Sequence, residues 1–411
     1  MANISKQRRE ELIRKINEIK NAIHLMCEDI NKQTLVQYLY DLESEIKSKK
    51  YGLVYEEHKE CIDEILENNT PVLIEDESLF IDNGGKINFL IEGDNLASLI
   101  LLKKTLRNMV DVIYIDPPYN TGNKDFVYND DAVDKVDTFR HSKWLSFMQK
   151  RLQLSRTLLS EKGLIFVSID DNEQAVLKTL CDSIFNEQNY ITMFIRKTKS
   201  MTGDDGNGLN IQHEYLLVYA KDKSKATFIG EQKTFEGYSN PDNDPNGIWC
   251  SADPSAKSGG ETTYFPIKNP YTGQVDYPPK GRYWAFSQET LKKYISSGRV
   301  KFKKEIKKGQ RGFIFKRYAE NMEVKTNPVN TLYFCDNAYM NSIATTETNN
   351  LIGAGKFSYP KPVEFIKQII KYTSNEKSLI IDFFAGSGTT AHAVMQLNKE
   401  DGGNRSFVLC T

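Results

Sequence analysis

The chain lacks the features by which several classes of protein are recognised. Its six cysteines are scattered without a Cys-x-x-Cys pair and its five histidines are dispersed, so the sequence favours neither a metal centre nor a disulfide framework. No apolar run approaches the roughly 18 residues that span a bilayer. Residues 1–6 lack the apolar core of a signal peptide. These absences predict a protein without membrane segments that works in a reducing cytoplasm.

Charge is nearly balanced over the chain but not along it. The 411 residues carry a formal net charge of −1, with 27% charged residues, which does not by itself suggest nucleic acid. Between residues 282 and 318, however, twelve basic residues are opposed by two acidic ones, and eight aromatic residues lie among them. This pattern is typical of a surface that follows a phosphate backbone and stacks on bases, although most charge runs are simply solvated faces. The residues expected to contact nucleic acid are Arg282, Lys292, Lys293, Arg299, Lys301, Lys303, Lys304, Arg311 and Arg317.

The order of apolar segments predicts an α/β sheet that is interrupted by an insert. Apolar residues at helical spacing predict a helical arm or hairpin over about 6–67. Strands are expected at 86–91, 110–115, 163–169, 191–196, 214–220, 379–381 and 406–410, with helices between most of them. Such alternation is typical of a mainly parallel, doubly wound sheet. We therefore divide the chain into an arm (1–70), a first α/β half (71–220), an inserted domain of short strands (221–348) and a second α/β half (349–411).

The most informative segment is Asp-Pro-Pro-Tyr, Asp116–Tyr119, which closes the strand at 110–115. Open α/β sheets bind ligands at the carboxyl ends of their strands. The two prolines fix the backbone and remove two donors, so nearby carbonyls stay free to accept hydrogen bonds. A carboxylate, a free carbonyl and an aromatic ring suit a planar base with an exocyclic amino group. A simple Pro-Pro turn with Tyr119 as packing explains the same four residues equally well.

A second turn, Asp382–Thr390, joins a strand to a helix through Gly-x-Gly. Glycines permit a tight turn and a close approach of the backbone to a ligand. The helix start offers N–H groups to a carboxylate or phosphate. Alone, this turn predicts either a dinucleotide site or a plain connection. The preceding segment, Phe-Ser-Tyr-Pro-Lys-Pro at 357–362, makes a ligand site more specific because it brings Ser358 and Lys361 to the same edge of the sheet.

Together these segments resemble the β class of DNA amino-methyltransferases, and most closely the modification subunits of type III restriction–modification systems. In that class the catalytic motif comes first, the target-recognition region second and the S-adenosylmethionine motif last. The resemblance covers most of residues 86–411 and is carried by 93–96, 116–126, 163–171, 213–214, 361–362 and 382–390. It implies a circularly permuted, Rossmann-like methyltransferase sheet with an inserted target-recognition domain. The permutation places the strand at 406–410 beside the strand at 86–91.

The resemblance also implies roles for individual residues. Asp116 and Pro117 would hold N6 of an adenine flipped out of duplex DNA, and Tyr119 would stack on it, with Pro118 completing the motif. Asn120, Thr121, Asn123 and Phe126 would order the loop. S-adenosylmethionine would be bound by Asp94, near its adenine, by Lys361, near its carboxylate, and by Asp382, Phe384, Gly386, Ser387, Gly388 and Thr389. Asp rather than Ser at position 116 favours adenine N6 over cytosine N4. The lack of a Pro-Cys pair argues against cytosine C5.

Several alternatives stay open at this point. The chain is expected to work on double-stranded DNA as a homodimer, together with a restriction subunit that carries helicase and nuclease functions. A catalytically silent DNA-recognition subunit and an N4-cytosine methyltransferase are the alternatives. The arm either mediates dimerisation or partner docking or simply caps the sheet. The chain ends at Thr411, where the family usually continues with an acidic residue for the cofactor ribose, so we expect a truncated chain.

Overall fold

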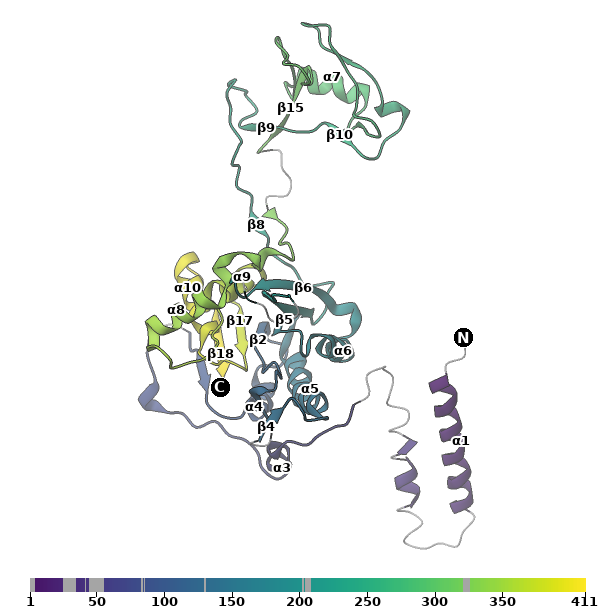
Figure 1. The fold of residues 1–411 in the computed structure, drawn as a ribbon, viewed down its shortest axis with the longest axis vertical. Helices are drawn as coiled ribbons and strands as arrows, with labels where there is room; N and C mark the ends of the chain where they lie inside the picture. The colour runs from purple at the N-terminus through teal and green to yellow at the C-terminus, as the bar shows by residue number, and fades with distance from the viewer. Residues whose placement is uncertain are drawn as a thin grey trace. The chain divides into compact units, whose positions relative to one another are not determined.

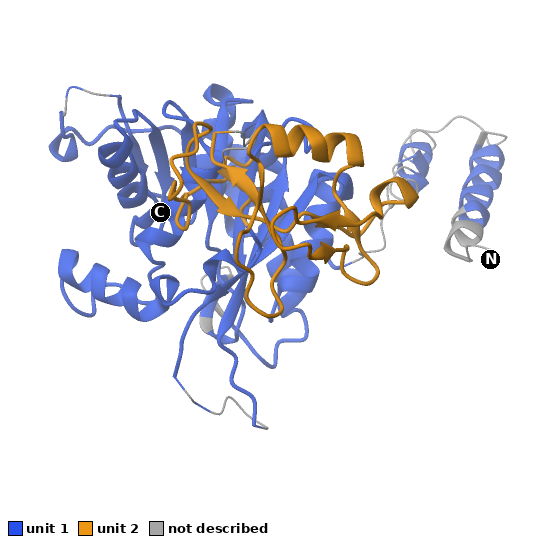
Figure 2. Ribbon diagram, turned by 90° about the horizontal axis from the view of Figure 1, so that it is seen from above, with its two compact units in different colours: residues 1–227, 330–411 blue, residues 228–329 orange. Residues whose placement is uncertain are grey.

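The computed structural model describes residues 4–24, 35–40, 42–43, 55–82, 84, 86–128, 131–201, 203, 208–320 and 326–411. The chain divides into two compact units, which Figure 2 shows in different colours. Unit 1 comprises residues 1–227 and 330–411, and unit 2 comprises residues 228–329. Residues 221–227 and 330–348, which we expected to belong to the insert, are therefore part of unit 1.

Unit 1 is built around one seven-stranded sheet (Figure 1) with the strand order β1-β18-β17-β2-β5-β7-β6. In that order the strands are Phe89–Ile91, Ser406–Cys410, Leu379–Asp382, Val110–Ile115, Leu159–Ile169, His213–Ala220 and Tyr190–Lys197. From β1 to β5 all neighbours are parallel, whereas β7 is antiparallel to β5 and to β6. The prediction of a mainly parallel α/β sheet is confirmed.

The first and last strands of the chain lie side by side in this sheet. Phe89 of β1 is opposite Val408 of β18, and Ile91 is opposite Cys410. The N–H of Thr411 donates to the carbonyl of Ile91 over 3.0 Å, which extends the pairing by one residue. The circularly permuted arrangement that the strand count implied is therefore present.

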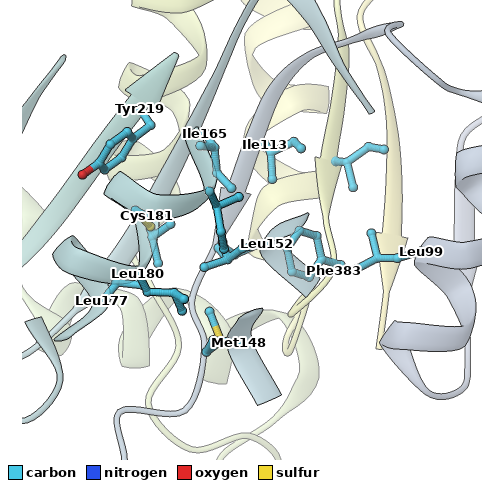
Figure 3. Packing of buried hydrophobic residues seen from close by; sticks show 14 of the residues in the cluster. Leu99, Ile113, Met148, Leu152, Ile165, Leu177, Leu180, Cys181, Tyr219 and Phe383 are labelled. Carbon is cyan, nitrogen blue, oxygen red and sulfur yellow. The ribbon is translucent and has the colours of Figure 1, made fainter. Parts of the chain in front are cut away.

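Helices cover both faces of the sheet. Because successive side chains of a strand point to opposite faces, Ile113 joins one core with Leu152 of α5, whereas Tyr114 contacts Phe365 of α9 at 6.1 Å between ring centroids. Figure 3 shows the first of these cores, where Met148 and Leu152 face the strands. The helices of that face are α4 (Asn95–Thr105), α5 (Arg140–Leu158) and α6 (Gln174–Phe185), and those of the other face are α9 (Val363–Thr373) and α10 (Thr389–Asp401).

The remaining elements of unit 1 are short or lie towards the N-terminus. They are α1 (Ile4–His24), α3 (Cys61–Asn68), α8 (Asn341–Ile352), the hairpin of β3 (Asn123–Tyr128) and β4 (Asp131–Asp134), and the 3₁₀ turns Glu77–Leu79, Glu187–Asn189, Tyr333–Cys335 and Asn337–Tyr339. The expected helical arm is interrupted, because residues 55–60 are not helical. Its parts at 25–34, 41 and 44–54 lie outside the described residues. Among the helices that the structure describes, none is long and apolar enough to cross a membrane.

Unit 2 consists of short strands around an aromatic core. Its three-stranded sheet has the order β14-β15-β9, and α7 is its helix. The elements are β8 (Glu231–Gln232), β9 (Trp249–Ser251), β10 (Ser255–Ala256), η3 (Glu261–Thr263), β11 (Ile267–Lys268), β12 (Val275–Asp276), β13 (Tyr283–Trp284), α7 (Gln288–Ser296), β14 (Val300–Phe302), β15 (Phe313–Tyr318) and β16 (Thr326–Asn327).

Four aromatic residues of the basic segment belong to this core, and Tyr294 and Phe302 pack against it while partly exposed. Trp284, Phe286, Phe313 and Phe315 are at most 9% exposed and pack together with Val300. The interpretation of these rings as stacking platforms for bases is therefore wrong. A small domain of short strands has few aliphatic side chains to bury, and large rings provide the apolar area that its core needs.

Candidate functional site

The two turns singled out from the sequence open into one cavity at the carboxyl edge of the sheet. This cavity has a volume of about 650 Å³ and lies within unit 1. It is lined by residues of both turns, by the segment 357–361 and by Gly93–Asn95. Of the residues expected to bind the cofactor, the lining includes Asp94, Lys361, Asp382, Phe384, Gly386, Ser387 and Thr389.

Asp116 lies at the end of β2 and is held by a lysine. The Nζ of Lys361 donates to both carboxylate oxygens of Asp116 over 2.7 Å, and the Lys361 side chain is 10% exposed. The resemblance implied a place for Lys361 near the cofactor carboxylate, whereas the structure places it on Asp116. An ammonium group that is removed from water needs an anionic partner, and Asp116 is the nearest carboxylate.

The ion pair of Lys361 and Asp116 lies next to a second, buried ion pair between Arg196 and Glu214. Glu214 lies 3.7 Å from Lys361 Nζ and accepts from the Nε of Arg196 over 2.7 Å. Arg196 is also fixed by the carbonyl of Tyr339 over 2.5 Å. Although burial alone would raise the pKa of Glu214, the charges of Arg196 and Lys361 hold that pKa below its usual range. Charges therefore alternate in sign from Arg196 to Asp116. Sequence reasoning missed Arg196, whose only signal is a charged residue near the end of an otherwise apolar strand.

The two proline carbonyls of the Asp-Pro-Pro-Tyr motif differ in whether a donor is bound to them. The indole Nε1 of Trp144 donates to the carbonyl of Pro118 over 2.7 Å. Within the described residues no donor is paired with the carbonyl of Pro117, which lines the cavity. The ring of Tyr119 lies 5.0 Å from Lys361 Nζ. Burial raises the pKa of its hydroxyl well above the usual range, and the carboxylate of Asp116 adds to this, so the phenol stays neutral.

The loop after Tyr119 is hydrogen-bonded to the start of α5 and to Glu173, the residue before α6. Asn120 adopts a φ of 57°, a left-handed conformation that asparagine tolerates. Its buried Nδ2 donates to Glu173 Oε1 over 2.5 Å, and the Nδ1 of His141 lies 2.6 Å from the same oxygen. Burial raises the pKa of Glu173. Further along, Thr121 donates to Asp125 through both its N–H and its hydroxyl. No sequence pattern singled out Glu173, because its partners come from two other segments.

The second turn, Asp382–Thr390, combines a buried carboxyl group with two glycines in the left-handed conformation, where other side chains are strained. Asp382 is 2% exposed and accepts from the N–H of Phe384 over 3.0 Å and from the hydroxyl of Thr390 over 2.6 Å. Burial raises its pKa to about 7. Gly386 has a φ of 51°, and a Cβ there would lie 2.9 Å from the ring of Phe357. Gly388, with a φ of 77°, precedes the first residue of α10.

The wall of the cavity around Asp94 is supported from the N-terminal segment. Asp94 caps α4 by accepting from two backbone N–H groups, over 2.8 and 3.2 Å. Arg151 is 1% exposed, and its Nε donates to Asn95 Oδ1 over 2.6 Å. Glu60 closes the network by accepting from both Nη atoms of Arg151 over 2.9 and 3.0 Å. The residues just before α3 thus hold a side chain that lines the cavity.

Glu60→Ala is expected to lower the free energy of unfolding by up to ~3–5 kcal/mol, because it removes the hydrogen-bonded partner of a buried ion pair and leaves Arg151 with the more distant carboxylate of Asp94 at 3.8 Å. Urea unfolding followed by circular dichroism measures this change. Glu67→Ala is the matched control: Glu67 lies on α3, the helix that Glu60 precedes, is 58% exposed and pairs with exposed Lys59. Equal midpoints for the two variants would contradict the role given to Glu60.

The basic residues expected to contact nucleic acid fall into two groups within unit 2. Arg282 and Arg311 lie 3.3 and 3.7 Å from Asp253, and Arg299 lies over the ring of Tyr294 at 4.6 Å. Lys301 is exposed but pairs with Asp242 over 2.6 Å, and Lys303 donates to Gln310 over 3.2 Å. The other exposed cations are Lys292, Lys293, Lys304 and Arg317.

Comparison with known proteins places most of the chain in one family. Residues 110–409 match the family model described as DNA methylase. The type III restriction-modification enzyme StyLTI Mod subunit of Salmonella typhimurium is 36% identical over 84% of this chain and 56% of that protein, so the chain spans little more than half of its length. The type II methyltransferase M.KpnI of Klebsiella pneumoniae is 35% identical over 77% of this chain and 78% of that protein. Among solved structures, the cytosine-N4-specific PvuII DNA methyltransferase is 11% identical, with a TM-score of 0.38 over 79% of this chain and 82% of that one.

Proposed function

The chain belongs to the DNA methylase family, and from that premise we propose that it transfers a methyl group from S-adenosylmethionine to N6 of an adenine flipped out of duplex DNA. The observation that carries this proposal is the single cavity of about 650 Å³ into which both turns open. One side of the cavity offers acceptors for an amine. The other offers a glycine turn, a helix start and a buried carboxyl group.

The residues of the second turn fit S-adenosylmethionine. Gly386 and Gly388 leave room beside the backbone where any Cβ would be strained. The start of α10 suits the carboxylate of the cofactor, and Asp382 suits its cationic groups. Asp94 is proposed to lie near its adenine. When bound, S-adenosylmethionine supplies an electrophilic methyl group on a sulfonium.

Asp116 and the carbonyl of Pro117 are proposed to bind the exocyclic amine of the target. This nitrogen is a poor nucleophile because its lone pair is delocalised into the ring. Two acceptors that bind its two hydrogens favour a tetrahedral nitrogen and orient the lone pair out of the plane of the ring. Asp116 can then accept the proton that the nitrogen loses. Positioning and preorganised electrostatics supply the acceleration, without a covalent enzyme intermediate.

Lys361 must leave Asp116 before an amine can bind there. Its Nζ lies 2.7 Å from both oxygens that the amine would use. Glu214, at 3.7 Å, and the carboxylate of the cofactor are the anions to which it can move. The base would then lie against Tyr119, on the face over which the ammonium group now lies.

We place this activity in the modification and recognition subunit of a restriction–modification system. The support is the identity to a type III Mod subunit over most of the chain. In this proposal unit 2, residues 228–329, reads the DNA sequence. A restriction subunit and a second copy are the partners, and residues 1–70 serve docking. The protein would work in the cytoplasm, on chromosomal DNA.

Incubation of the purified protein with tritiated S-adenosylmethionine and unmodified duplex DNA tests the proposed function. We expect tritium in the DNA and, after digestion to nucleosides, N6-methyladenine by mass spectrometry. Methylome sequencing of a host that expresses the protein then gives the recognition sequence. N4-methylcytosine would overturn the assignment to adenine. Cofactor binding and DNA binding without any transfer would point instead to a silent recognition subunit.

A further inference from the structure

A second, open cleft of about 810 Å³ lies in unit 1 beside the loop that follows Tyr119. Three of its lining side chains are cations, three carry neutral hydrogen-bonding groups and one is apolar. They are Lys135, Arg140, Lys199, Thr121, Asn123, Asn172 and Ile211. A lining that combines cations and neutral donors without a carboxylate is complementary to anionic oxygens, above all to phosphates.

Lys135 packs directly on Gly122, in the loop that follows Tyr119. Gly122 has a φ of 75°, and a Cβ built there would overlap Lys135 Cγ and lie 2.9 Å from Lys135 N. Lys135 therefore occupies the space that a side chain at position 122 would need. The ammonium group of Lys135 is carried by a stem that packs on the loop two residues after Asn120.

Arg140 is fixed to the same loop from the other side. It is the first residue of α5, and its carbonyl accepts from Asn120 Nδ2 over 3.2 Å. The stem of Lys135 and the backbone of Arg140 are thus both held against the loop that follows Tyr119. The cleft lies close to the motif along the chain, because Thr121 and Asn123, which line it, follow Tyr119 within four residues.

Several carboxylates near the cleft accept hydrogen bonds from other groups, among them Asp170, which accepts from the backbone and the side chain of Asn172 in the cleft lining. Asp125 accepts from Thr121, Asp137 pairs with Lys143 over 2.6 Å, and Glu173 accepts from Asn120. Within the described part of the chain no carboxylate forms an ion pair with Lys135 or Arg140. The Nε of Arg140 donates to His141 over 3.1 Å, and the other ring nitrogen of His141 lies 2.6 Å from Glu173 Oε1.

We propose that this cleft binds backbone phosphates of the DNA strand that carries the target base, next to the flipped nucleotide. The inference rests on the proposed function and adds a contact to it. A base at Asp116 stays attached to its own sugar and phosphates, so that strand must pass the rim of the pocket. Lys135 and Arg140 stand at that rim and fix the position of the strand. Phosphate contacts position a protein on DNA and carry no sequence information, so unit 2 is left to read the sequence.

The first test compares the salt dependence of DNA binding. Lys135→Met keeps most of the stem that packs on Gly122, and Arg140→Gln keeps a polar side chain. For the double variant we expect the slope of log affinity against log salt to become shallower by about 0.9 for each phosphate that is no longer neutralised, with cofactor affinity unchanged. The control removes two charges of α4, Lys103→Gln with Lys104→Gln, both exposed. Equal slopes for the two double variants would refute the cleft as a phosphate site.

The second test locates the phosphates. Once the methylated site is known, the linkages on either side of its adenine are replaced by neutral methylphosphonates. Wild-type protein is expected to bind this duplex more weakly, whereas the affinity of the Lys135→Met/Arg140→Gln variant should change little between the two duplexes. The proposal would be overturned if the loss of affinity caused by the methylphosphonates and the loss caused by the double substitution simply added. If the wild-type protein methylates DNA but the methylphosphonates weaken wild-type and variant protein equally, this inference alone is refuted. If the wild-type protein transfers no methyl group, the proposed function is refuted.

Discussion

Asp116→Asn is expected to slow methyl transfer by about 10²- to 10³-fold, the usual cost of removing one preorganised group at a reacting centre. The substitution keeps the shape of the side chain but removes the anion that would hold the amine and accept its proton. Lys361 keeps Glu214 as a neighbour at 3.7 Å, so the fold should tolerate the change. Single-turnover transfer of tritium to duplex DNA measures the rate.

Asp111→Asn provides the control for this prediction. Asp111 lies on the same strand, β2, at its other end, where it accepts from the hydroxyl of Ser160 over 3.1 Å. We expect its transfer rate to match that of the wild type. Cofactor affinity and DNA affinity of Asp116→Asn should stay within a few fold, because the loss concerns the reacting amine. A transfer rate within tenfold of the wild type would remove Asp116 from the catalytic centre.

The affinity for S-adenosylmethionine is expected to rise with pH and to level off above about pH 7. Burial raises the pKa of Asp382 to about 7, so a cationic ligand next to it favours the ionised form and binding releases a proton. Below pH 7 the carboxyl group is neutral and attracts the ligand less. Asp382→Asn should abolish this pH dependence and weaken binding at pH 8 by roughly 10- to 100-fold, as expected for a hydrogen bond to a charged group.

Calorimetry in two buffers of different ionisation enthalpy counts the released protons. Asp401→Asn is the control, because Arg405 lowers the pKa of Asp401 and that group does not titrate near pH 7.

The raised pKa of Asp382 also affects the stability of the fold. A folded-state pKa above the ordinary value stabilises the fold at acidic pH, and this contribution is lost as the pH rises through 7. Wild-type protein should therefore lose more thermal stability between pH 5 and pH 8 than Asp382→Asn does. Binding without pH dependence and without proton release would contradict both expectations.

The sequence predicted the sheet and the two turns, because these depend on short segments or on a pattern that repeats along the chain. Alternating apolar segments indicated the parallel sheet, because strands buried on both faces read as continuous apolar runs. The strand count indicated that β1 and β18 are neighbours, which their register confirms. The two turns could be recognised because proline and glycine restrict the backbone wherever they occur.

The sequence could not predict contacts that only the tertiary fold creates. Arg151 and Glu60 are separated by 91 residues, and Arg196 reaches residues after position 330. Nothing in the local pattern connects them. The partner of Lys361 was missed for a related reason, because a buried ammonium group takes the nearest carboxylate and the neighbours of Asp116 are set by the packing of α9 on the sheet. The aromatic rings of unit 2 were misread because the same residue types serve as stacking platforms and as core.

We propose that the two turns form one site, in which a cofactor at Asp382–Thr389 faces an amine at Asp116. A crystal structure of the protein with a non-reactive analogue of S-adenosylmethionine tests it most directly. We expect the analogue in the cavity of about 650 Å³, in contact with Gly386 and the start of α10. We also expect the end of the analogue that replaces the methyl group to point towards Asp116. An analogue bound elsewhere, or one turned away from Asp116, would contradict it.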